Sequence, residues 1–323
     1  MSESPPLDIP AEVVAAEQRI HAHVRQTPRE RSRWLSRLAD ADVFLKLECQ
    51  QITGSFKLRG AMNKVLSLSD EERSAGILTA SSGNHGTAVA YLMTRFGIPG
   101  TIFLPESVAT SKLEAIEAYD AHAELVPGDG IEAERRARKL AGERGQTYVS
   151  PYNDPLIIGG QGTVGLELRR QLERIDVVLV PVGGGGLASG IAGYLKSVDP
   201  KVTIIGCQPE NSRVMYESVK AGCVLDLESQ PTLADGTAGG IDHDSITFEL
   251  CRDLIDEWVL LTEEEIGAAI VATADKQHLL IEGAAAMPIA ALLRDPQRFT
   301  GQTVVLVVTG SKLSLKTLHK LLH

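Results

Sequence analysis

An α/β fold with two domains is predicted for this chain by three features of its sequence. Short apolar runs alternate with amphipathic stretches of helical length, which is the pattern of α/β proteins. Several of the short runs are apolar throughout, as expected for parallel strands that helices cover on both faces. The length of 323 residues is enough for one large α/β unit or for two domains.

The secondary structure follows from the spacing of apolar residues. The apolar runs predict strands at residues 43–47, 101–104, 177–180, 202–205 and 303–308. Helical periodicity predicts helices at residues 11–24, 87–95, 111–119, 131–144, 165–174 and 187–195. Capping boxes mark two more helix starts, because a hydroxyl and a carboxylate three residues later can each accept a backbone N–H: Ser69 with Glu72, and Thr262 with Glu265.

The domain division is expected to be discontinuous in sequence. Residues 75–152 form a compact strand–helix series between two regions that carry motifs. We therefore predict a small inserted domain over residues 75–152, which closes over the active site, and a large domain made of residues 1–74 and 153–323. Each domain is expected to contain a mostly parallel twisted sheet flanked by helices, with the active site in the cleft between the domains.

Composition excludes several classes of protein. The net charge of -10 argues against a nucleic-acid partner. The first ten residues do not have the pattern of a signal peptide, and no apolar stretch reaches the length of a membrane span. The four cysteines lack metal-ligand spacing and fit a reducing compartment: Cys49, Cys207, Cys223 and Cys251. We expect a cytoplasmic protein without a membrane partner.

Lys57 is the first candidate for chemistry. It lies in the sequence Ser-Phe-Lys-Leu-Arg-Gly, where the apolar neighbours Phe56 and Leu58 disfavour the charged ammonium form. A neutral lysine can attack an aldehyde and form a Schiff base. Taken alone, the same residue is better explained as a surface lysine at a helix start.

Four consecutive glycines follow the predicted strand 177–180: Gly183, Gly184, Gly185 and Gly186. Without side chains, their backbone N–H groups and the following helix start can approach an anion closely. The lysine and hydroxyl of a Walker loop are missing, and so is the GxGxxG spacing of dinucleotide sites. The turn therefore favours a single phosphate monoester over a nucleotide, with a simple glycine-rich turn as the alternative.

Other polar residues follow predicted strands or flank apolar segments. Residues 81–86, Ser-Ser-Gly-Asn-His-Gly, precede a helix whose free N–H groups can hold a carboxylate. Asn84 can bond a phenolic oxygen, whereas His85 is also explained as a cap or packing residue. Thr309 ends a strand and can bond a pyridine nitrogen, leaving it unprotonated. Glu282 is either buried near such a ligand or solvated.

An amine, a polar turn and a phosphate cradle together predict binding of pyridoxal phosphate. In this order the motifs resemble the fold-type II pyridoxal-phosphate enzymes, specifically the threonine/serine dehydratase and serine racemase family, whose fold is tryptophan synthase β-like. The motif Gly-Gln-Gly-Thr at 160–163 and Ile-Glu-Gly-Ala at 281–284 belong to the same resemblance, which spans residues 10 to 315.

The resemblance implies a role for each candidate residue. Lys57 is the Schiff-base lysine and, with Ser82, a catalytic residue. Cofactor contacts are implied for Phe56, Lys57, Asn84, Gly183, Gly184, Gly185, Gly186, Glu282 and Thr309. Ser81, Ser82, Asn84 and His85 are expected around the substrate carboxylate. The family also implies a homodimer.

Two departures from the family pattern matter. Racemase-like members bind a divalent cation through a carboxylate in a Gly-Val-Glu-Pro-type segment. This chain has Gln208 at that place, a poorer ligand for a hard cation, so no metal is predicted, although Glu210 could compensate. The family's Ser-Gly-Gly-Asn sequence reads Thr309-Gly310-Ser311-Lys312, which alters the contacts expected near the ring nitrogen.

The predicted function is a dehydratase that converts a β-hydroxy-α-amino acid such as L-threonine or L-serine to a 2-oxo acid and ammonia. The short segment after the last strand favours a catabolic enzyme. A less common substrate, such as 3-hydroxyaspartate or a hydroxyectoine-derived compound, stays open, with Arg59 and Arg213 as candidate partners for a second carboxylate. The alternatives are a serine racemase that uses Lys57 and Ser82 on opposite faces of the cofactor, and a non-catalytic amino-acid sensor.

Overall fold

The computed structural model describes residues 7–323, which form an α/β protein with two separate sheets. The larger sheet has six strands in the order β1-β2-β10-β7-β8-β9. Only β1 is antiparallel to its neighbour, and the other pairs are parallel. Its strands are β1 (Arg29–Arg31), β2 (Asp42–Lys46), β10 (Thr303–Val307), β7 (Val177–Pro181), β8 (Thr203–Pro209) and β9 (Glu257–Leu261).

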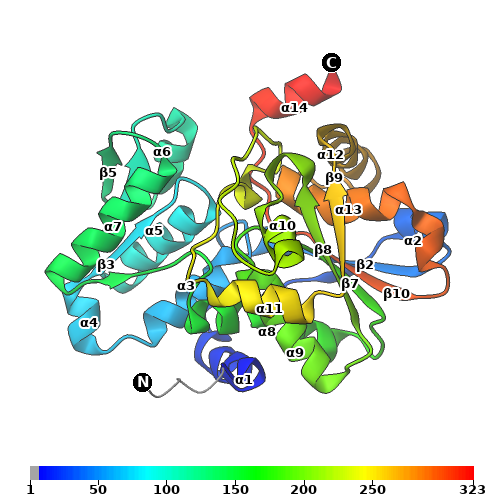
Figure 1. Cartoon of the computed structure of the whole chain (residues 1–323), viewed down its shortest axis with the longest axis horizontal. Helices are drawn as coiled ribbons and strands as arrows, with labels where there is room; N and C mark the ends of the chain where they lie inside the picture. The colour runs from blue at the N-terminus through cyan, green and yellow to red at the C-terminus, as the bar shows by residue number, and fades with distance from the viewer. Residues whose placement is uncertain (1–6) are drawn as a thin grey trace.

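The smaller sheet has four parallel strands in the order β5-β4-β3-β6. They are β5 (Ala123–Val126), β4 (Gly100–Pro105), β3 (Ile77–Ala80) and β6 (Thr147–Tyr148). Helices α4 (Asp70–Ala75), α5 (Asn84–Phe96), α6 (Thr110–Glu117) and α7 (Gly130–Arg144) lie on this side of the molecule, at the left of Figure 1. The four-stranded sheet therefore lies entirely within residues 77–148.

The remaining helices surround the larger sheet or join it to the smaller one (Figure 1). They are α1 (Ile9–Ile20), α2 (Arg33–Ala39), α3 (Lys57–Leu66), α8 (Pro155–Gln171), α9 (Gly186–Val198), α10 (Val214–Ala221), α11 (Ile246–Leu254), α12 (Glu263–Gln277), α13 (Gly283–Arg294) and α14 (Leu315–Leu322). Short 3-10 turns lie at η1 (Glu48–Gln50), η2 (Glu210–Ser212), η3 (Asp235–Thr237) and η4 (Pro296–Phe299). None of the helices in the described range is long and apolar enough to cross a bilayer.

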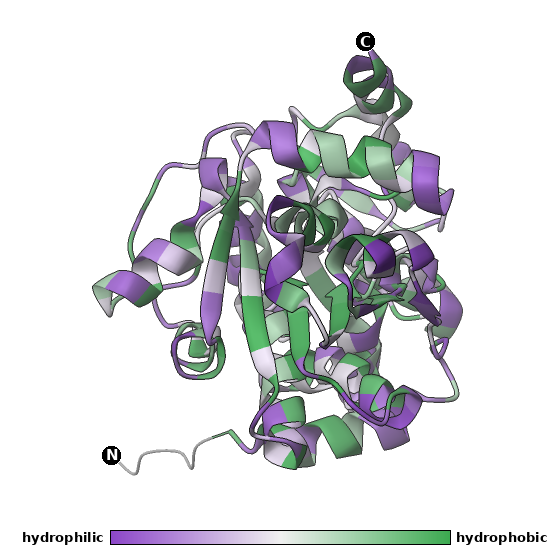
Figure 2. Cartoon of the chain, turned by 90° about the vertical axis from the view of Figure 1, so that its right-hand side faces the viewer, coloured by the Kyte–Doolittle hydropathy of each residue, from purple (hydrophilic) through white to green (hydrophobic). Residues whose placement is uncertain are grey.

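The cores explain why the central strands are apolar throughout. Every residue of β7 is buried, and separate hydrophobic clusters cover the two faces of the six-stranded sheet. The green strands at the centre of Figure 2 show this concentration of hydrophobic residues. The core of the smaller sheet also receives side chains from α3, among them Leu58, Met62 and Val65. Helix α3 thus packs against both parts of the protein.

Most predicted elements are confirmed, including both capping boxes. The prediction of a helix over residues 165–174 was wrong at both ends, because α8 runs from Pro155 to Gln171. Its start is capped by Asp154, whose side chain accepts from the backbone N–H groups of Leu156 and Ile157. Glycines in its first three turns hide the helical periodicity, yet they are needed for close packing. A Cβ on Gly160 would lie 2.6 Å from the Cα of Gly60 in α3.

Candidate active site

The predicted site residues lie where strands of both sheets end. Strand β3 leads into the loop 81–83 and α5, strand β7 leads into the glycine turn and α9, and β10 is followed by Thr309. The carboxyl ends of parallel strands border the crevice in which open α/β sheets bind ligands. Lys57, the first residue of α3, and Glu282, the N-cap of α13, complete the set.

Lys57 presents an amine with a lowered proton affinity. Its Nζ donates a hydrogen bond to the carbonyl oxygen of Pro151 at 2.8 Å and lies 5.2 Å from the ring centroid of Phe56. Burial lowers the pKa of Lys57 to about 8, although the negative charge of Glu282 acts in the opposite direction. The amine is therefore much closer to its neutral, nucleophilic form at physiological pH than an exposed lysine.

The four glycines form a turn. At two of its four positions, only glycine fits. Gly185 has a φ of +85°, and a Cβ on it would lie 2.7 Å from the sulfur of Cys251. A Cβ on Gly184 would lie 2.4 Å from the ring of Tyr152, the residue after the Lys57 acceptor Pro151. Within residues 7–323, the N–H groups of the four glycines have no backbone acceptor, and α9 has no side-chain cap. Such a helix start fits a phosphate.

Asn84, Glu282 and Lys312 form a chain of contacts across the two sheets. Asn84 Nδ2 donates to both carboxylate oxygens of Glu282, and the Lys312 backbone N–H donates to Glu282 Oε2 at 3.1 Å. The Lys312 ammonium donates to the hydroxyl of Thr87 on α5. Burial raises the pKa of Glu282, opposed by the bond from Asn84. Gly310 permits this packing, since a Cβ there would lie 2.3 Å from Glu282 Oε1.

Three predicted site residues each carry a buried polar atom without a partner among the described residues: Thr309, Asn84 and His85. Thr309 is 2% exposed, and its Oγ1 makes no hydrogen bond among the described residues, although its carbonyl accepts from the Phe56 N–H at 3.1 Å. The Oδ1 of Asn84 is likewise unpaired in that part of the chain. Buried polar atoms usually have a partner, so these atoms are available to bond a ligand. An amine, a phosphate cradle and a buried hydroxyl together fit pyridoxal phosphate.

The loop after β3 holds the remaining predicted residues. Ser81 and Ser82 are half-buried, and Ser81 Oγ accepts from the Gly83 N–H at 3.3 Å. His85 is buried, and its ring nitrogen Nε2 lies 3.0 Å from the carbonyl oxygen of Val149. Burial, with a contribution from the charge of Lys57, lowers the pKa of His85 to about 3. The imidazole is therefore neutral, with Nε2 facing the fold and Nδ1 without a partner in the described range.

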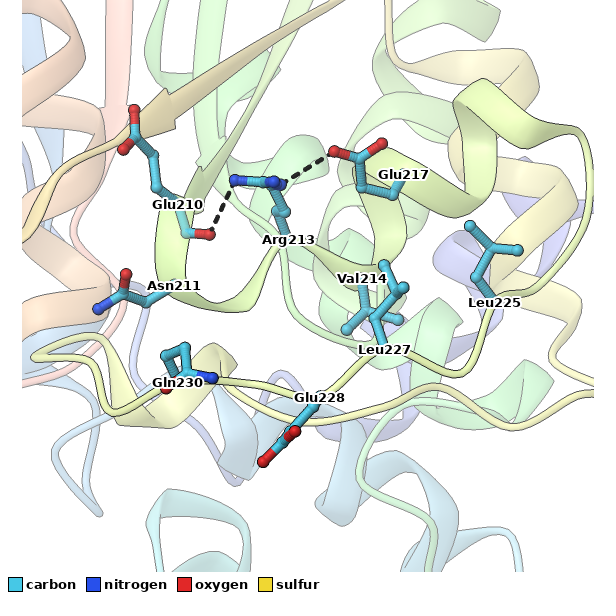
Figure 3. A pocket seen from close by; sticks show the side chains of 9 residues that line it. All are labelled: Glu210, Asn211, Arg213, Val214, Glu217, Leu225, Leu227, Glu228 and Gln230. Carbon is cyan, nitrogen blue, oxygen red and sulfur yellow. Dashed lines mark hydrogen bonds and ion pairs between the residues drawn. The ribbon is translucent and has the colours of Figure 1, made fainter.

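Neither arginine is available for a second substrate carboxylate. The idea was wrong for Arg59, because its guanidinium is completely buried and paired with Glu48 and Glu167. Arg213 is paired with Glu217 at 2.9 Å. It lines a separate pocket of about 440 Å³, shown in Figure 3, that contains none of the predicted site residues.

Gln208, at the place where the family pattern of racemase-like members has a cation ligand, is held by protein contacts. Gln208 is 1% exposed, its Nε2 donates to the Val182 carbonyl at 3.1 Å, and its Oε1 accepts from the Tyr216 N–H at 2.8 Å. Glu210 lines the separate pocket of Figure 3. No cluster of three or more His, Cys, Asp or Glu residues suited to a metal occurs in the described range.

Sequence reasoning missed several residues of the cleft. Pro151 and Tyr152 follow β6 and carry no motif. Lys112 on α6 pairs with Asp235 of η3 at 3.0 Å and so joins the two parts of the protein. The sequence did show that a lysine stands at position 312 in place of the family's asparagine. It did not show the contact of Lys312 with Thr87, because the two residues are 225 positions apart.

Comparisons with known proteins agree with this geometry. The family model described as "Pyridoxal-phosphate dependent enzyme" matches residues 20–310. An L-threonine ammonia-lyase of Thermotoga maritima is 38% identical over 97% of this chain and 77% of its own length. A threonine deaminase structure from Solanum lycopersicum has a TM-score of 0.92 at 30% identity, over 100% of this chain and 93% of that one. Maize serine racemase has a TM-score of 0.91 at 32% identity, over 96% and 95%.

Proposed function

Because the chain belongs to the family of pyridoxal-phosphate-dependent enzymes, we propose that it is a lyase acting on β-hydroxy-α-amino acids. It removes ammonia from a substrate such as L-threonine or L-serine and leaves a 2-oxo acid. The observation that carries this proposal is the Lys57 amine, with its pKa lowered to about 8, at the meeting of the two sheets. Relatives named as threonine ammonia-lyase and threonine deaminase support the reaction class.

The residues of the cleft divide into those that hold the cofactor and those that hold the substrate. The N–H groups of residues 183–186 would bind the phosphate, Asn84 the ring oxygen and Thr309 the ring nitrogen, with Phe56 against the ring. The free N–H groups at the start of α5, with Ser81 and Ser82, would bind the substrate carboxylate. When bound, the cofactor withdraws electrons from the α-carbon of the substrate.

Lys57 is the group that moves the proton. A base with a pKa near the working pH combines a useful neutral fraction with sufficient basicity. The Nζ of Lys57 takes the α-proton, and the β-hydroxyl takes up a proton and leaves as water. The proton held on Nζ balances the one that the leaving oxygen takes up, so Lys57 returns to its neutral form. The product hydrolyses to a 2-oxo acid and ammonia, so the water lost in elimination is taken up again. The imidazole of His85 is too weak a base for this transfer, because its pKa of about 3 keeps it neutral, and its Nε2 faces the Val149 carbonyl.

The test is a substrate panel with the purified enzyme and added pyridoxal phosphate. L-threonine, L-serine and 3-hydroxyaspartate are compared by 2-oxo acid formation, and a hydroxyectoine-derived compound extends the panel. We expect 2-oxo acid from at least one of them, together with a long-wavelength absorbance band that Lys57→Ala abolishes. Wild-type protein that shows neither the band nor a product would refute the proposal.

A second candidate function is amino-acid racemisation. It is favoured by Ser82, a hydroxyl residue in the loop between β3 and α5, and by the likeness to maize serine racemase. Racemisation needs a proton donor on the cofactor face opposite Lys57. Ser82→Ala should then abolish D-isomer formation from L-serine, measured by chiral chromatography, while 2-oxo acid formation continues. Equal loss of both products would contradict this role of Ser82.

We also propose that the enzyme is a cytoplasmic homodimer and that residues 75–152 close as a small domain over the cleft. Support for closure comes from cross-cleft contacts such as Lys112–Asp235 and Arg138–Asp242, both at 3.0 Å. Sedimentation measures the oligomeric state. Small-angle scattering with and without a substrate analogue measures closure, and an unchanged radius would contradict it.

A further inference from the structure

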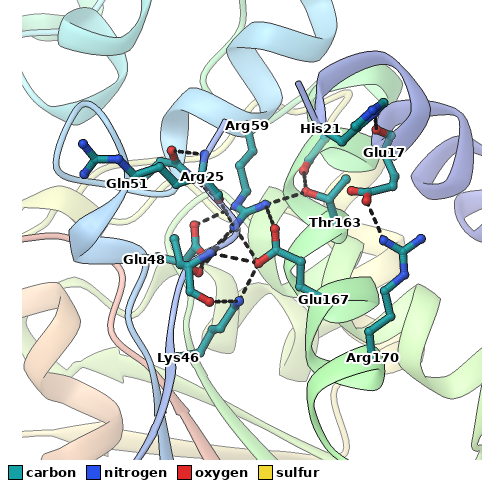
Figure 4. A network of polar contacts seen from close by, with 12 residues as sticks. Glu17, His21, Arg25, Lys46, Glu48, Gln51, Arg59, Thr163, Glu167 and Arg170 are labelled. Atoms are coloured by element: carbon teal, nitrogen blue, oxygen red, sulfur yellow. Dashed lines mark hydrogen bonds and ion pairs between the residues drawn. The ribbon is translucent and has the colours of Figure 1, made fainter. Parts of the chain in front are cut away.

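A group of four buried charges is centred on Arg59, which follows Lys57 in α3, and takes no part in the proposed chemistry. It consists of Lys46, Glu48, Arg59 and Glu167, called here the buried quartet, and Figure 4 shows it with its neighbours. The side chains of Lys46, Glu48 and Arg59 are 0% exposed, and that of Glu167 is 5% exposed. Arg59 stands two positions after Lys57 in the first turn of α3.

The guanidinium of Arg59 is held by two carboxylates at once. Its Nε and Nη2 donate to the two oxygens of Glu48 at 2.7 and 2.8 Å. Its Nη1 and Nη2 donate to the two oxygens of Glu167 at 2.7 and 2.9 Å. This forked geometry fixes the orientation of the guanidinium plane as well as its position, which a lysine ammonium would not do.

Lys46, at the end of β2, is the second cation of the quartet and pairs with Glu167. Its Nζ donates to Glu167 Oε2 at 2.5 Å, to the Thr27 carbonyl at 2.9 Å and to Gln171 Oε1 at 3.1 Å. Two positive groups therefore face two carboxylates. Although burial acts to raise the pKa of Glu48, the Arg59 guanidinium lowers it below its usual range.

The quartet joins elements that are distant in sequence. Arg59 belongs to α3, Glu48 to η1, Lys46 to β2 and Glu167 to α8. A buried ion pair stabilises a fold little more than well-packed apolar residues, so stability alone does not account for four buried charges. What the quartet adds is a fixed geometry among these elements, centred on Arg59.

The segment that carries Lys57 is anchored on its other side as well. The Phe56 N–H donates to the Thr309 carbonyl, and Ser55 forms a β-bridge with Gly310. The Gly60 N–H faces Gln161 Oε1 of α8 at 3.3 Å. The first turn of α3 is thus held between the end of β10 and the quartet.

We propose that Arg59, oriented by Glu48 and Glu167, is a positioning residue that sets the location of the Lys57 amine. It acts through the backbone of the first turn of α3 and touches neither substrate nor cofactor. This inference rests on the proposed function only in taking Lys57 as the reactive amine. The consequence is that loss of the fork displaces the amine, and a displacement of about 1 Å can cost roughly a hundredfold in rate.

The chain offers a matched control in Lys46. Like Arg59 it is a fully buried cation paired with Glu167, but its described contacts lie on the loop before β1 and on α8, not on α3. Arg59→Lys keeps the charge and loses the fork, whereas Lys46→Met removes a charge and leaves the fork. Both changes are expected to lower the melting temperature.

The experiment compares the two variants with wild type as apoenzyme and as holoenzyme. In the apoenzyme, amide hydrogen exchange is measured over residues 57–62. In the holoenzyme, kcat, KM and the circular dichroism of the bound cofactor are measured. We expect Arg59→Lys to speed exchange over residues 57–62, reduce the dichroism and lower kcat by about ten- to a hundredfold with little change in KM. Lys46→Met leaves the fork, and with it the position of the amine, so it should keep all four within about twofold.

Several outcomes would overturn the proposal. If both variants melt earlier but keep wild-type kcat, exchange and dichroism, the quartet only stabilises the fold. Equal loss of kcat in both variants would also show that Arg59 has no special positioning role.

Should Arg59→Lys not fold, Glu48→Gln replaces it, since the amide keeps the shape and weakens one side of the fork. Wild-type values in Glu48→Gln would likewise refute the proposal. If wild type itself shows no cofactor signal, the proposed function has failed. The exchange data on the apoenzyme do not depend on the cofactor, so they still test whether Arg59 positions the first turn of α3.

Discussion

Asn84 donates hydrogen bonds to both carboxylate oxygens of Glu282, at 2.8 Å to Oε1 and 3.0 Å to Oε2. Asn84 begins α5 beside the smaller sheet, and Glu282 caps α13 on the larger one. The pair therefore connects the two parts of the protein. It also leaves a carboxylate close enough to Lys57 to influence its protonation.

Replacing Glu282 by glutamine should lower the pKa of Lys57 below about 8. Burial disfavours the charged ammonium of Lys57, whereas the negative charge of Glu282 stabilises it. Glutamine removes that charge, so only the effect of burial remains. The pH dependence of Lys57 modification by an amine-reactive reagent, followed by mass spectrometry of the apoenzyme, measures the shift. Glu265→Gln serves as a control because Glu265 pairs with Arg294, outside the cleft. An unchanged midpoint in Glu282→Gln would contradict the electrostatic role of Glu282.

Removing the amine should stabilise the apoenzyme near neutral pH. The pKa of Lys57 falls from 10.5 to about 8 on folding, so the unfolded chain binds the proton more tightly. This destabilisation is complete below about pH 8 and disappears above 10.5. We expect Lys57→Met to raise the unfolding free energy at pH 7 by about 1–2 kcal/mol, with allowance for partial exposure. Denaturant titrations at pH 7 and pH 10.5 measure the difference, and a gain of equal size at both values would show that packing, not charge, is the cause.

The glycine turn should not tolerate a methyl group at Gly185. Its φ of +85° and the 2.7 Å approach to Cys251 predict that Gly185→Ala costs about 1–3 kcal/mol of stability and weakens cofactor binding. Gly142→Ala is the matched control, since Gly142 lies inside α7 with nothing within 4 Å of a Cβ. Alanine should stabilise that helix by about 0.5–1 kcal/mol. Thermal unfolding and fluorescence titration with pyridoxal phosphate compare the two. Wild-type affinity in Gly185→Ala would argue against phosphate binding at this turn.

Lys312 should affect substrate binding more than stability. Its ammonium bonds Thr87 across the cleft and its backbone N–H bonds Glu282. Lys312→Met breaks only the bond to Thr87 in the first turn of α5, whose N–H groups are proposed to bind the substrate carboxylate, so we expect KM to rise by about three- to tenfold. The unfolding free energy should fall by about 1 kcal/mol, the contribution of one hydrogen bond. Lys316→Met, on α14, is the control and should leave both unchanged. A fall in kcat at constant KM would instead place Lys312 in the chemical step.

The sequence predicted the architecture well where the signals are local. Both capping boxes and the five apolar strands need only neighbouring residues for their interpretation, and the structure contains them. The start of α8 was missed because glycines at Gly159, Gly160 and Gly162 resemble a loop. Their purpose becomes clear only when α1, α3 and α9 pack against them.

The sequence motifs predicted the residues of the candidate site, but not the charged partners of those residues. Arg59 belongs to a recognised motif, yet its partners Glu48 and Glu167 stand 11 and 108 positions away. No periodicity connects such residues. For the same reason the role of Lys312 could not be foreseen, although its departure from the family pattern was visible.

The position of β10 has a consequence for how the protein is made. This strand lies between β2 and β7 in the interior of the larger sheet, although it is the last strand to be synthesised. Until residues 303–307 have been synthesised, β2 and β7 each lack the neighbour that they have in the finished sheet. Thr309 and Gly310 arrive with them and meet Phe56 and Ser55 beside the reactive lysine. Chains that stop before residue 303 therefore lack an interior strand of the larger sheet and the residues that this strand places beside Phe56 and Ser55.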